Sequence, residues 1–267
     1  MLSYTGYRLH QAPPLHKLSI PATTVTLVLS WGDPIRVLTA HDQLLTGTCW
    51  HAALVGLHTA AVTTETGGTA QGVQVEMTPL GAYSLLGIPL RHISDTMIEP
   101  ADVLGQRWVA RLVGRLAGAT DWPARWAALN EALTNRLSEG PTPSPVTVEA
   151  WHRLCASKGT MPVAELARAT GRSSRRLESL FREQIGLPPK QLARIVRFQH
   201  AITRPPRAGL TWAETAAACG YHDQAHMARE FRALTGLTAT RFHSSAARAR
   251  DTTATPVHGR ITALRIR

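Results

Sequence analysis

The chain has 267 residues and is 44% hydrophobic, which excludes a disordered chain, and no apolar run approaches the ~20 residues of a membrane-spanning helix. Residues 1–149 hold 9 Lys and Arg against 11 Asp and Glu, a balance of −2, whereas residues 150–267 hold 20 against 7, a balance of +13. The back half is therefore expected to bind a polyanion.

The front half shows the sequence patterns of an α+β domain. Segments rich in β-branched residues with partial alternation are expected to form strands at 23–31, 49–64 and 72–79. The glycine-containing stretch 66–72 is expected to be a hairpin loop. Helical patterns follow at 79–87, 103–119 and 123–139. Residues 1–140 are therefore expected to form a small mixed or antiparallel sheet domain with helices.

Alternating prolines mark the boundary that follows. Every second residue from Pro141 to Pro145 is proline, which keeps the chain extended and prevents a helix from continuing. Residues 141–147 are therefore expected to be an inter-domain linker. An all-helical domain is expected over 148–245, followed by a basic, loosely ordered tail at 246–267.

The back half contains an internal repeat. Residues 163–189 can be laid on residues 212–239 with one inserted residue. Identities fall on both sides of the insertion: Ala164, Glu165, Ala167 and Gly171 match Ala213, Glu214, Ala216 and Gly220, and Phe181, Arg182, Gly186 and Leu187 match Phe231, Arg232, Gly236 and Leu237. Such agreement is not expected by chance, so one structural unit is used twice.

Each copy has the pattern of a helix–turn–helix. Small residues in the first helix allow close packing, and Gly171 or Gly220 takes the turn because glycine enters the left-handed region at low cost. Ser173 and Asp223 are expected to cap the second helix. Apolar residues at helical spacing are expected to face the core: Leu177, Leu180, Phe181, Met227, Phe231 and Leu234.

A further helix is expected between the copies, at 188–202. Its predicted buried stripe consists of Leu192, Ile195, Gln199 and Ile202, with Arg194 and Arg197 beside it. Such a helix spans roughly 20 Å. It is suited to hold two DNA-reading helices a fixed distance apart, to match major grooves about 34 Å apart on one face of DNA.

Each copy also carries a specific motif. The first reads S-x-x-x-L-x-x-x-F-R-x-x-x-G-x-x-P from Ser173 to Pro189, and the second reads G-Y-x-D-x-x-x-x-x-R-x-F-R-x-x-x-G from Gly220 to Gly236. With these motifs, residues 150–243 resemble the DNA-binding domain of the AraC/XylS family of bacterial transcription regulators. The resemblance implies a sequence-specific regulator that inserts two recognition helices into successive major grooves.

The resemblance also implies which residues contact DNA. The candidates for base-edge contacts are Arg175, Glu178, Ser179, Gln224, Ala225, His226, Ala228 and Arg229. The candidates for phosphate contacts are Ser174, Arg176, Arg182, Lys190 and Arg232. Arginine suits guanine, glutamine suits adenine, and alanine offers only an apolar contact, for instance to a thymine methyl group.

The expected partners are double-stranded promoter or operator DNA and RNA polymerase. Family members commonly use the front domain to sense a small molecule, to dimerise, or both, so a small-molecule effector and a homodimer are left open here. No enzyme activity and no cofactor are expected. One alternative is an enzymatic front domain fused to a DNA-binding module, although no G-x-S-x-G and no glycine-rich phosphate loop supports it. Another is a nucleoid-type protein with little sequence preference.

Cysteines and the first residues indicate the compartment. Cys49, Cys155 and Cys219 are scattered without a C-x-x-C, which disfavours a disulfide framework and thiolate zinc. The stretch that begins at Met1 lacks the charged-then-apolar order of a signal peptide. We expect a cytoplasmic protein without a membrane partner.

Histidine pairs raise the question of a metal site. His222 and His226 have H-x-x-x-H spacing, but if Asp223 caps the helix they do not share a helical face. His51 and His58 are expected on one strand, where a separation of seven puts them on opposite faces. No metal is therefore expected at either pair.

Three tryptophans, Trp108, Trp122 and Trp126, are open to two readings. They can line an apolar ligand pocket or act as anchors in the core or at an interface, and we favour the anchors.

Overall fold

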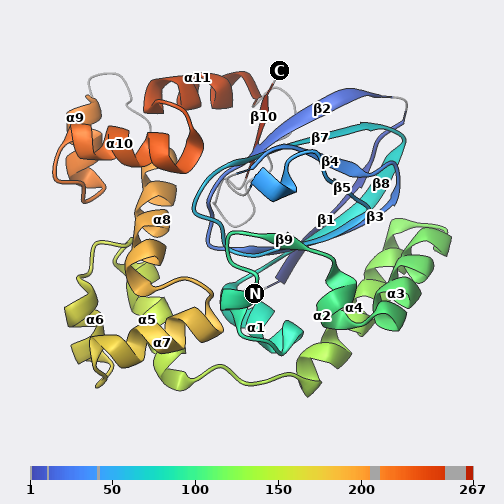
Figure 1. Cartoon of the computed structure of the whole chain (residues 1–267), viewed down its shortest axis with the longest axis horizontal. Helices are drawn as coiled ribbons and strands as arrows, with labels where there is room; N and C mark the ends of the chain where they lie inside the picture. Colours follow the sequence, from blue (N-terminus) through green and yellow to red (C-terminus); the bar gives the residue numbers. More distant parts are fainter. Residues whose placement is uncertain (1, 11, 41–42, 205–210, 250–262, 267) are drawn as a thin grey trace.

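The computed structural model describes residues 2–10, 12–40, 43–204, 211–249 and 263–266. The front half and one strand from the end of the chain form two five-stranded antiparallel sheets (Figure 1). The order in the first sheet is β1 (Leu2–Arg8), β8 (Ala70–Met77), β3 (Val25–Gly32), β6 (Ala52–Val55) and β9 (Met97–Ile98). The order in the second is β10 (Ala263–Ile266), β2 (Ala12–Ser19), β7 (Val62–Gly68), β4 (Ile35–Thr39) and β5 (Cys49–Trp50).

Two of the three expected strands are confirmed, since 23–31 corresponds to β3 and 72–79 to β8. The expected strand at 49–64 is wrong: the segment is divided among β5, β6 and the start of β7. The break follows Gly56, where a Cβ atom would lie 1.8 Å from the carbonyl oxygen of Ile93. Only glycine allows that close approach of two backbones.

The stretch 66–72 is not the loop of a hairpin. Strands β7 and β8 run through it to either side of Thr69, and they belong to different sheets. The segment is therefore a corner at which the chain passes from the second sheet to the first.

A layer of helices covers the outer face of the first sheet. It consists of α1 (Pro79–Leu86), the short α2 (Pro100–Leu104), α3 (Gln106–Gly118) and α4 (Trp122–Glu139). The helix expected at 103–119 is interrupted at Gly105, whose φ of 90° and ψ of 136° end α2 and begin α3. Two 3-10 turns, η1 (Gln43–Leu45) and η2 (Leu90–His92), complete the front half.

The predicted linker is shorter than expected. Helix α4 ends at Glu139 and α5 (Pro145–Ala156) begins at Pro145, so the expectation of an extended segment through residue 147 is wrong for its last three residues. Proline fits the first turn of a helix, because the N–H that it lacks has no helical partner there.

In the part that the structure describes, the back half is helical as expected, and its last helix continues past the expected boundary at 245 to Ala249. The first helix–turn–helix unit consists of α6 (Val163–Ala169) and α7 (Ser174–Gln184), and the second of α9 (Trp212–Ala218) and α10 (Gln224–Thr235). Helix α8 (Pro189–Ile202) joins them, and α11 (Ala239–Ala249) follows the second unit (Figure 1). Within the described residues, no helix combines the length and apolar character needed to cross a membrane.

The expected loosely ordered tail, 246–267, is wrong in two places, the first being residues 246–249, which are the end of helix α11. Residues 250–262 lie outside the described residues. Residues Ala263–Ile266 are not loosely ordered but form β10, which pairs antiparallel with β2, so that Ala263 faces Ser19 and Ile266 faces His16.

Two apolar cores hold the molecule together. The first runs without interruption from the first sheet through the helices of the front half into α5, α6 and α7. The second joins Leu18 and Ile20, in and just after β2, to aromatic residues of α8, α10 and α11: Phe198, Phe231 and Phe242. Each helix–turn–helix unit therefore shares a core with the front half.

Candidate nucleic-acid interface

The first helix–turn–helix unit has the turn and cap that the sequence predicts. Gly171 adopts a φ of 65° between α6 and α7. Ser173 caps α7, and its hydroxyl accepts a hydrogen bond of 3.2 Å from the backbone N–H of Arg176. Leu177, Leu180 and Phe181 are buried, as expected.

The opposite face of α7 is exposed. All candidates of the first unit lie on the surface: Ser174, Arg175, Arg176, Glu178, Ser179, Arg182 and, at the start of α8, Lys190. One pair among them is engaged, since Arg182 donates to Glu178 at 3.0 Å with both side chains about half exposed. Contact of either with DNA would have to compete with that pair, which is worth little in water.

The second unit repeats the arrangement. Gly220 has a φ of 74°, and Asp223 caps α10 by accepting the backbone N–H of His226 at 2.6 Å. That hydrogen bond, with a smaller contribution from His222, holds the pKa of Asp223 below its usual range. Asp223 is therefore the helix cap that its sequence position predicted.

The exposed face of α10 carries most of its candidates. Gln224, Ala225, Arg229 and Arg232 are exposed, whereas His226 and Ala228 are half-buried. The ring of His226 packs edge-on against Tyr221 at 5.4 Å. Four of the six candidates of this unit are therefore fully presented to a partner.

Helix α8 connects the two units as predicted. Its expected stripe is buried: Leu192, Ile195, Gln199 and Ile202. The two arginines beside that stripe turn toward α10, where Arg194 and Arg197 lie 2.8 Å and 3.9 Å from the carboxylate of Glu230. Neither arginine is presented to solvent as a DNA contact would be, since both are half-buried.

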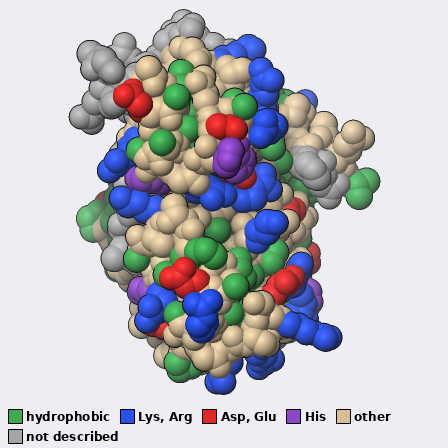
Figure 2. Space-filling model, turned by 90° about the vertical axis from the view of Figure 1, so that its left-hand side faces the viewer, with side chains coloured by type: hydrophobic (Ala, Val, Ile, Leu, Met, Phe, Trp, Pro, Cys, Tyr) green, Lys and Arg blue, Asp and Glu red, His purple; other side chains and the backbone are tan. Residues whose placement is uncertain are grey.

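The face of the molecule formed by the helical units is rich in positive charge. Figure 2 shows Lys and Arg side chains spread over this face from one unit to the other, with fewer acidic side chains among them. This distribution agrees with the balance of +13 in the back half and suits a phosphate backbone that crosses both units.

The histidines do not form a metal site in the described part of the chain, where no group of three His, Cys, Asp or Glu could hold an ion. His222 precedes α10 and its Nδ1 lies 3.2 Å from Asp223. The expectation that His51 and His58 share a strand is wrong, because His51 lies between β5 and β6 and His58 follows β6.

The tryptophans pack against the first core, in agreement with the reading as anchors. Trp122 stacks on Trp126 with ring centroids 5.0 Å apart, and the guanidinium of Arg125 lies 5.2 Å from the Trp122 ring. Trp108 packs in the same way beneath Arg136, at 5.6 Å.

Two features near the interface and the sheets were not predicted: the burial of Glu230, and the unpaired Nε2 atom of His58, which the sequence patterns presented only as a possible metal ligand. Glu230 falls three residues after the buried Met227, so a carboxylate on the apolar stripe of α10 was a usable signal. In His58, the buried Nε2 atom has no hydrogen-bond partner in the described structure, and the local sequence gives no sign of this.

Comparisons with known proteins bear on the helical half first. A family model described as a helix-turn-helix domain, of the AraC type, matches residues 166–245, which contain both units and α8. No curated protein sequence matches the chain.

A search of solved structures finds ToxT from Vibrio cholerae, with 10% identity, 90% of this chain and 97% of that chain covered, and a TM-score of 0.46. ToxT bound to an unsaturated fatty acid has 9% identity, 90% and 94% covered, and a TM-score of 0.45. An AraC-type regulator from Chromobacterium violaceum has 21% identity over 38% of this chain and 91% of its own, with a TM-score of 0.34. The family match coincides with the two capped, exposed helices of the basic half. The chain is thus a DNA-binding transcription regulator with an AraC-type helix-turn-helix domain.

Proposed function

We propose that α7 and α10 enter two successive major grooves on one face of the DNA. The observation that carries this proposal is that both helices bury their apolar stripes and keep the opposite face exposed, while one packed helix, α8, joins the two units. A rigid connection of this kind suits two sites one helical turn apart.

The proposed base contacts come from the exposed side chains of the two faces. On α7 they are Arg175, Glu178 and Ser179, and on α10 they are Gln224, Ala225, His226, Ala228 and Arg229. We give Arg175 and Arg229 the leading roles, because an exposed guanidinium can bind the two acceptors of guanine together. The half-buried His226 and Ala228 have less surface to offer.

The proposed phosphate contacts surround these side chains: Ser174, Arg176, Arg182, Lys190 and Arg232. They supply affinity without sequence preference, because each cation that meets a phosphate releases a counterion. The same reasoning predicts binding that weakens steeply as salt rises.

The proposed division of labour follows the chain. The helical domain from 145 to 245 binds DNA, residues 141–144 connect, and residues 1–140 sense a small molecule, dimerise, or both. RNA polymerase is the protein partner that such a regulator recruits or blocks at a promoter. The tail, 246–267, adds positive charge to the basic half of the chain.

Selection of bound sequences from random duplex DNA tests the proposal. The full-length protein should enrich an asymmetric consensus of roughly 20 base pairs per protomer, since two different helices read two grooves. Binding without any enriched motif would support a nucleoid-type protein instead. Turnover of a substrate by the full chain, abolished by a change confined to residues 1–140, would support the bifunctional alternative.

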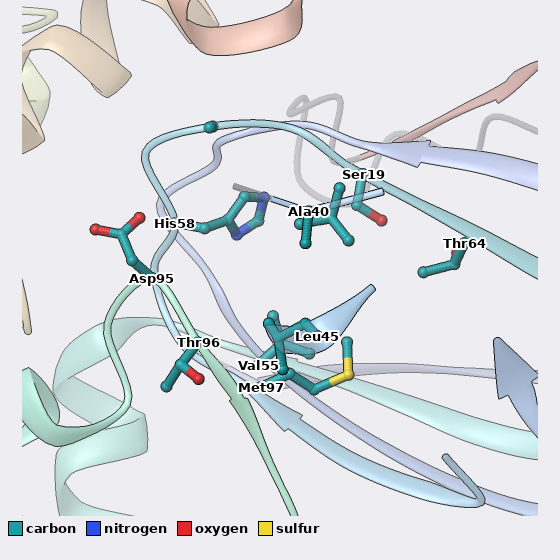
Figure 3. Close-up of a pocket in the computed structure, with 11 residues that line it drawn as sticks. Ser19, Ala40, Leu45, Val55, His58, Thr64, Asp95, Thr96 and Met97 are labelled. Atoms are coloured by element: carbon teal, nitrogen blue, oxygen red, sulfur yellow. The ribbon is translucent and has the colours of Figure 1, made fainter. Parts of the chain in front are cut away.

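A cavity between the two sheets favours the sensing role. It has a volume of ≈ 60 Å³ and is lined largely by apolar side chains from both sheets, including Val55, Val62 and Met97 (Figure 3). The ring of His58 projects into this space, whereas Asp95 points away from it. Burial lowers the pKa of His58, an effect that the backbone of Gly56 and Ile20 offsets only in part, so the ring is neutral at pH 7. Its buried Nε2 atom makes no hydrogen bond of normal geometry in the described structure.

A small apolar molecule with one hydrogen-bonding group would complete this cavity. The ring nitrogen of His58 would bind the polar group, and the apolar lining would bind the remainder. Such a ligand leaves no buried polar atom unsatisfied, which is the reason to expect affinity for it.

The walls of the cavity also lead directly to helix α8. On one wall, Ser19 lies between Leu18 and Ile20, which both belong to the second core. Two residues further along the chain, the carbonyl oxygen of Pro21 accepts a hydrogen bond of 2.7 Å from Gln199 in α8. On the other wall, Asp95 follows Ser94, whose hydroxyl donates at 2.9 Å to the carbonyl oxygen of Gly186, just before α8.

The test of sensing uses the full chain and a collection of small metabolites. Compounds that raise the thermal unfolding temperature are then tested on His58→Leu, which removes the ring nitrogen and keeps an apolar filling. The expected effector stabilises the wild type, loses most of that effect on His58→Leu, and changes operator affinity. Stabilisation that is equal in both proteins would place the ligand elsewhere and remove the cavity from the proposal.

A further inference from the structure

A buried carboxylate lies where the second reading helix meets the connecting helix. Glu230 belongs to α10, one position before Phe231, and its side chain is only 9% exposed. A carboxylate taken out of water at such a place must be compensated by positive charge or by hydrogen bonds.

Its partners come mainly from α8. Oε1 of Glu230 accepts a hydrogen bond of 2.8 Å from Nε of Arg194, and Oε2 lies 3.9 Å from Nε of Arg197. The latter guanidinium also lies over the ring of Tyr221, at 5.2 Å. Two cations one turn apart on α8 therefore converge on one carboxylate of α10.

A fourth side chain joins the cluster from the reading face. Nε2 of His226 lies 3.7 Å from Oε1 of Glu230, one helical turn along α10. His226 is in the first turn of α10, where its backbone N–H completes the cap made by Asp223. The cluster of Glu230, Arg194, Arg197 and His226 thus extends from the connecting helix to the exposed end of the reading helix.

The two helices also meet through apolar side chains of the second core. Phe198 of α8 meets Phe231 of α10 edge to face, with ring centroids 5.1 Å apart. The hydrophobic effect that stabilises this contact has no direction of its own. A buried ion pair with one short hydrogen bond does have a direction, and it fixes rotation and register.

We propose that Glu230 is a positioning residue for DNA reading. By its bond to Arg194 and its approach to Arg197 it locks α10 to α8, and so sets the distance and rotation of the second reading helix relative to the first. Arg194 and Arg197 act inside the protein in this arrangement and do not serve as phosphate contacts. The inference rests on the proposed reading of two grooves by α7 and α10.

A spacing assay on the full-length protein tests this role separately from stability. The two half-sites of the selected consensus are placed at a series of separations, and affinity is measured for each, together with affinity for the second half-site alone. The variants are Glu230→Gln and the matched control Glu149→Gln, which breaks an exposed pair with Arg153 on α5. Thermal unfolding shows that each variant is folded at the assay temperature.

The wild type and Glu149→Gln should show one sharp optimum of spacing. Glu230→Gln should lose about tenfold or more at that optimum, lose much less at neighbouring spacings, and bind the isolated half-site as before. A purely structural role would instead lower binding to all duplexes alike. An unchanged spacing profile, or equal loss on the half-site, would overturn the inference.

A second variant keeps the test decisive if Glu230→Gln does not fold. Arg194→Gln changes a side chain that is itself 35% exposed, and it removes one partner of Glu230, whose carboxylate keeps Arg197. It should broaden the spacing optimum in the same direction, and retention of the sharp optimum would overturn the inference. If the wild type itself shows no enriched motif, the proposed reading of two grooves fails first.

Discussion

The side chain of Arg229 gives the most direct test of how this chain reads DNA. It is exposed on α10 and forms no salt bridge among the described residues, and its charge makes only the smallest contribution to lowering the pKa of Asp223. A bidentate contact with guanine is worth about 1–3 kcal/mol of discrimination, which corresponds to about 5- to 150-fold in affinity. Arg229→Ala should therefore weaken operator binding by that factor and binding to unrelated DNA by much less.

The assay is fluorescence anisotropy on the selected operator and on a scrambled duplex, over a series of salt concentrations. Arg232→Ala is the matched control, because Arg232 is an exposed arginine of the same helix that we assign to phosphate. The control should weaken both duplexes alike and reduce the salt slope by about 0.9. If Arg229→Ala behaves like this control, Arg229 is a phosphate contact and the reading face of α10 is wrongly assigned.

Three further predictions concern stability. Ser173→Ala should lower the free energy of unfolding by about 1 kcal/mol through loss of the α7 cap, measured by urea denaturation with circular dichroism. The pKa of Asp223 is lower in the folded protein than in the unfolded chain, so its charge stabilises the fold above the unfolded pKa, and this stabilisation is lost as pH falls through the folded pKa. Acid should therefore shift the urea midpoint of the wild type more than that of Asp223→Asn. Equal shifts would contradict a charge-dependent cap. Gly56→Ala should prevent the close approach of its backbone to Ile93 and destabilise the front half strongly. Gly114→Ala, which has open space around the new Cβ, should instead stabilise α3 by about 0.5–1 kcal/mol. Calorimetry that ranks the two variants otherwise would refute the packing argument.

The helical half could be predicted from sequence because its signals are local. A capping residue such as Ser173, a turn glycine such as Gly171 and an apolar stripe all lie within a dozen residues, and each fixes its own helix. The repeat then gives every signal twice. The exposed candidates of α7 and α10 follow directly, since the face opposite a buried stripe is the exposed one.

The front half could be predicted only in part, because strand pairing is a long-range property. Strand β1 pairs with β8, Leu2 opposite Met77, and the short β10 is a strand only because β2 lies beside it. Neither β1 nor β2 has a clean alternation, and two prolines interrupt the start of β2. The apolar runs of β3 and β8 were the ones strong enough to be recognised.

Burial of single polar groups escapes a linear reading for the same reason. Glu230 is buried because α8 brings two arginines to it, and His58 because two sheets enclose it. The partners of Glu230 are more than 30 residues away in sequence, so the pattern of α10 alone shows an apparent surface carboxylate.

The front half and the DNA-binding helices share apolar cores, and this limits which segments can be replaced in a chimera. A cut at residues 141–147 looks like a clean junction, yet it separates Leu18 and Ile20 from the apolar surface around Phe198 that they cover. A chimera joined there to a foreign front domain would expose that surface and lose the hydrogen bond between Gln199 and Pro21. A soluble chimera would therefore have to keep β2 and the residues after it together with the DNA-binding helices. The part of the protein that can be exchanged as a unit is thus not one continuous segment of the chain.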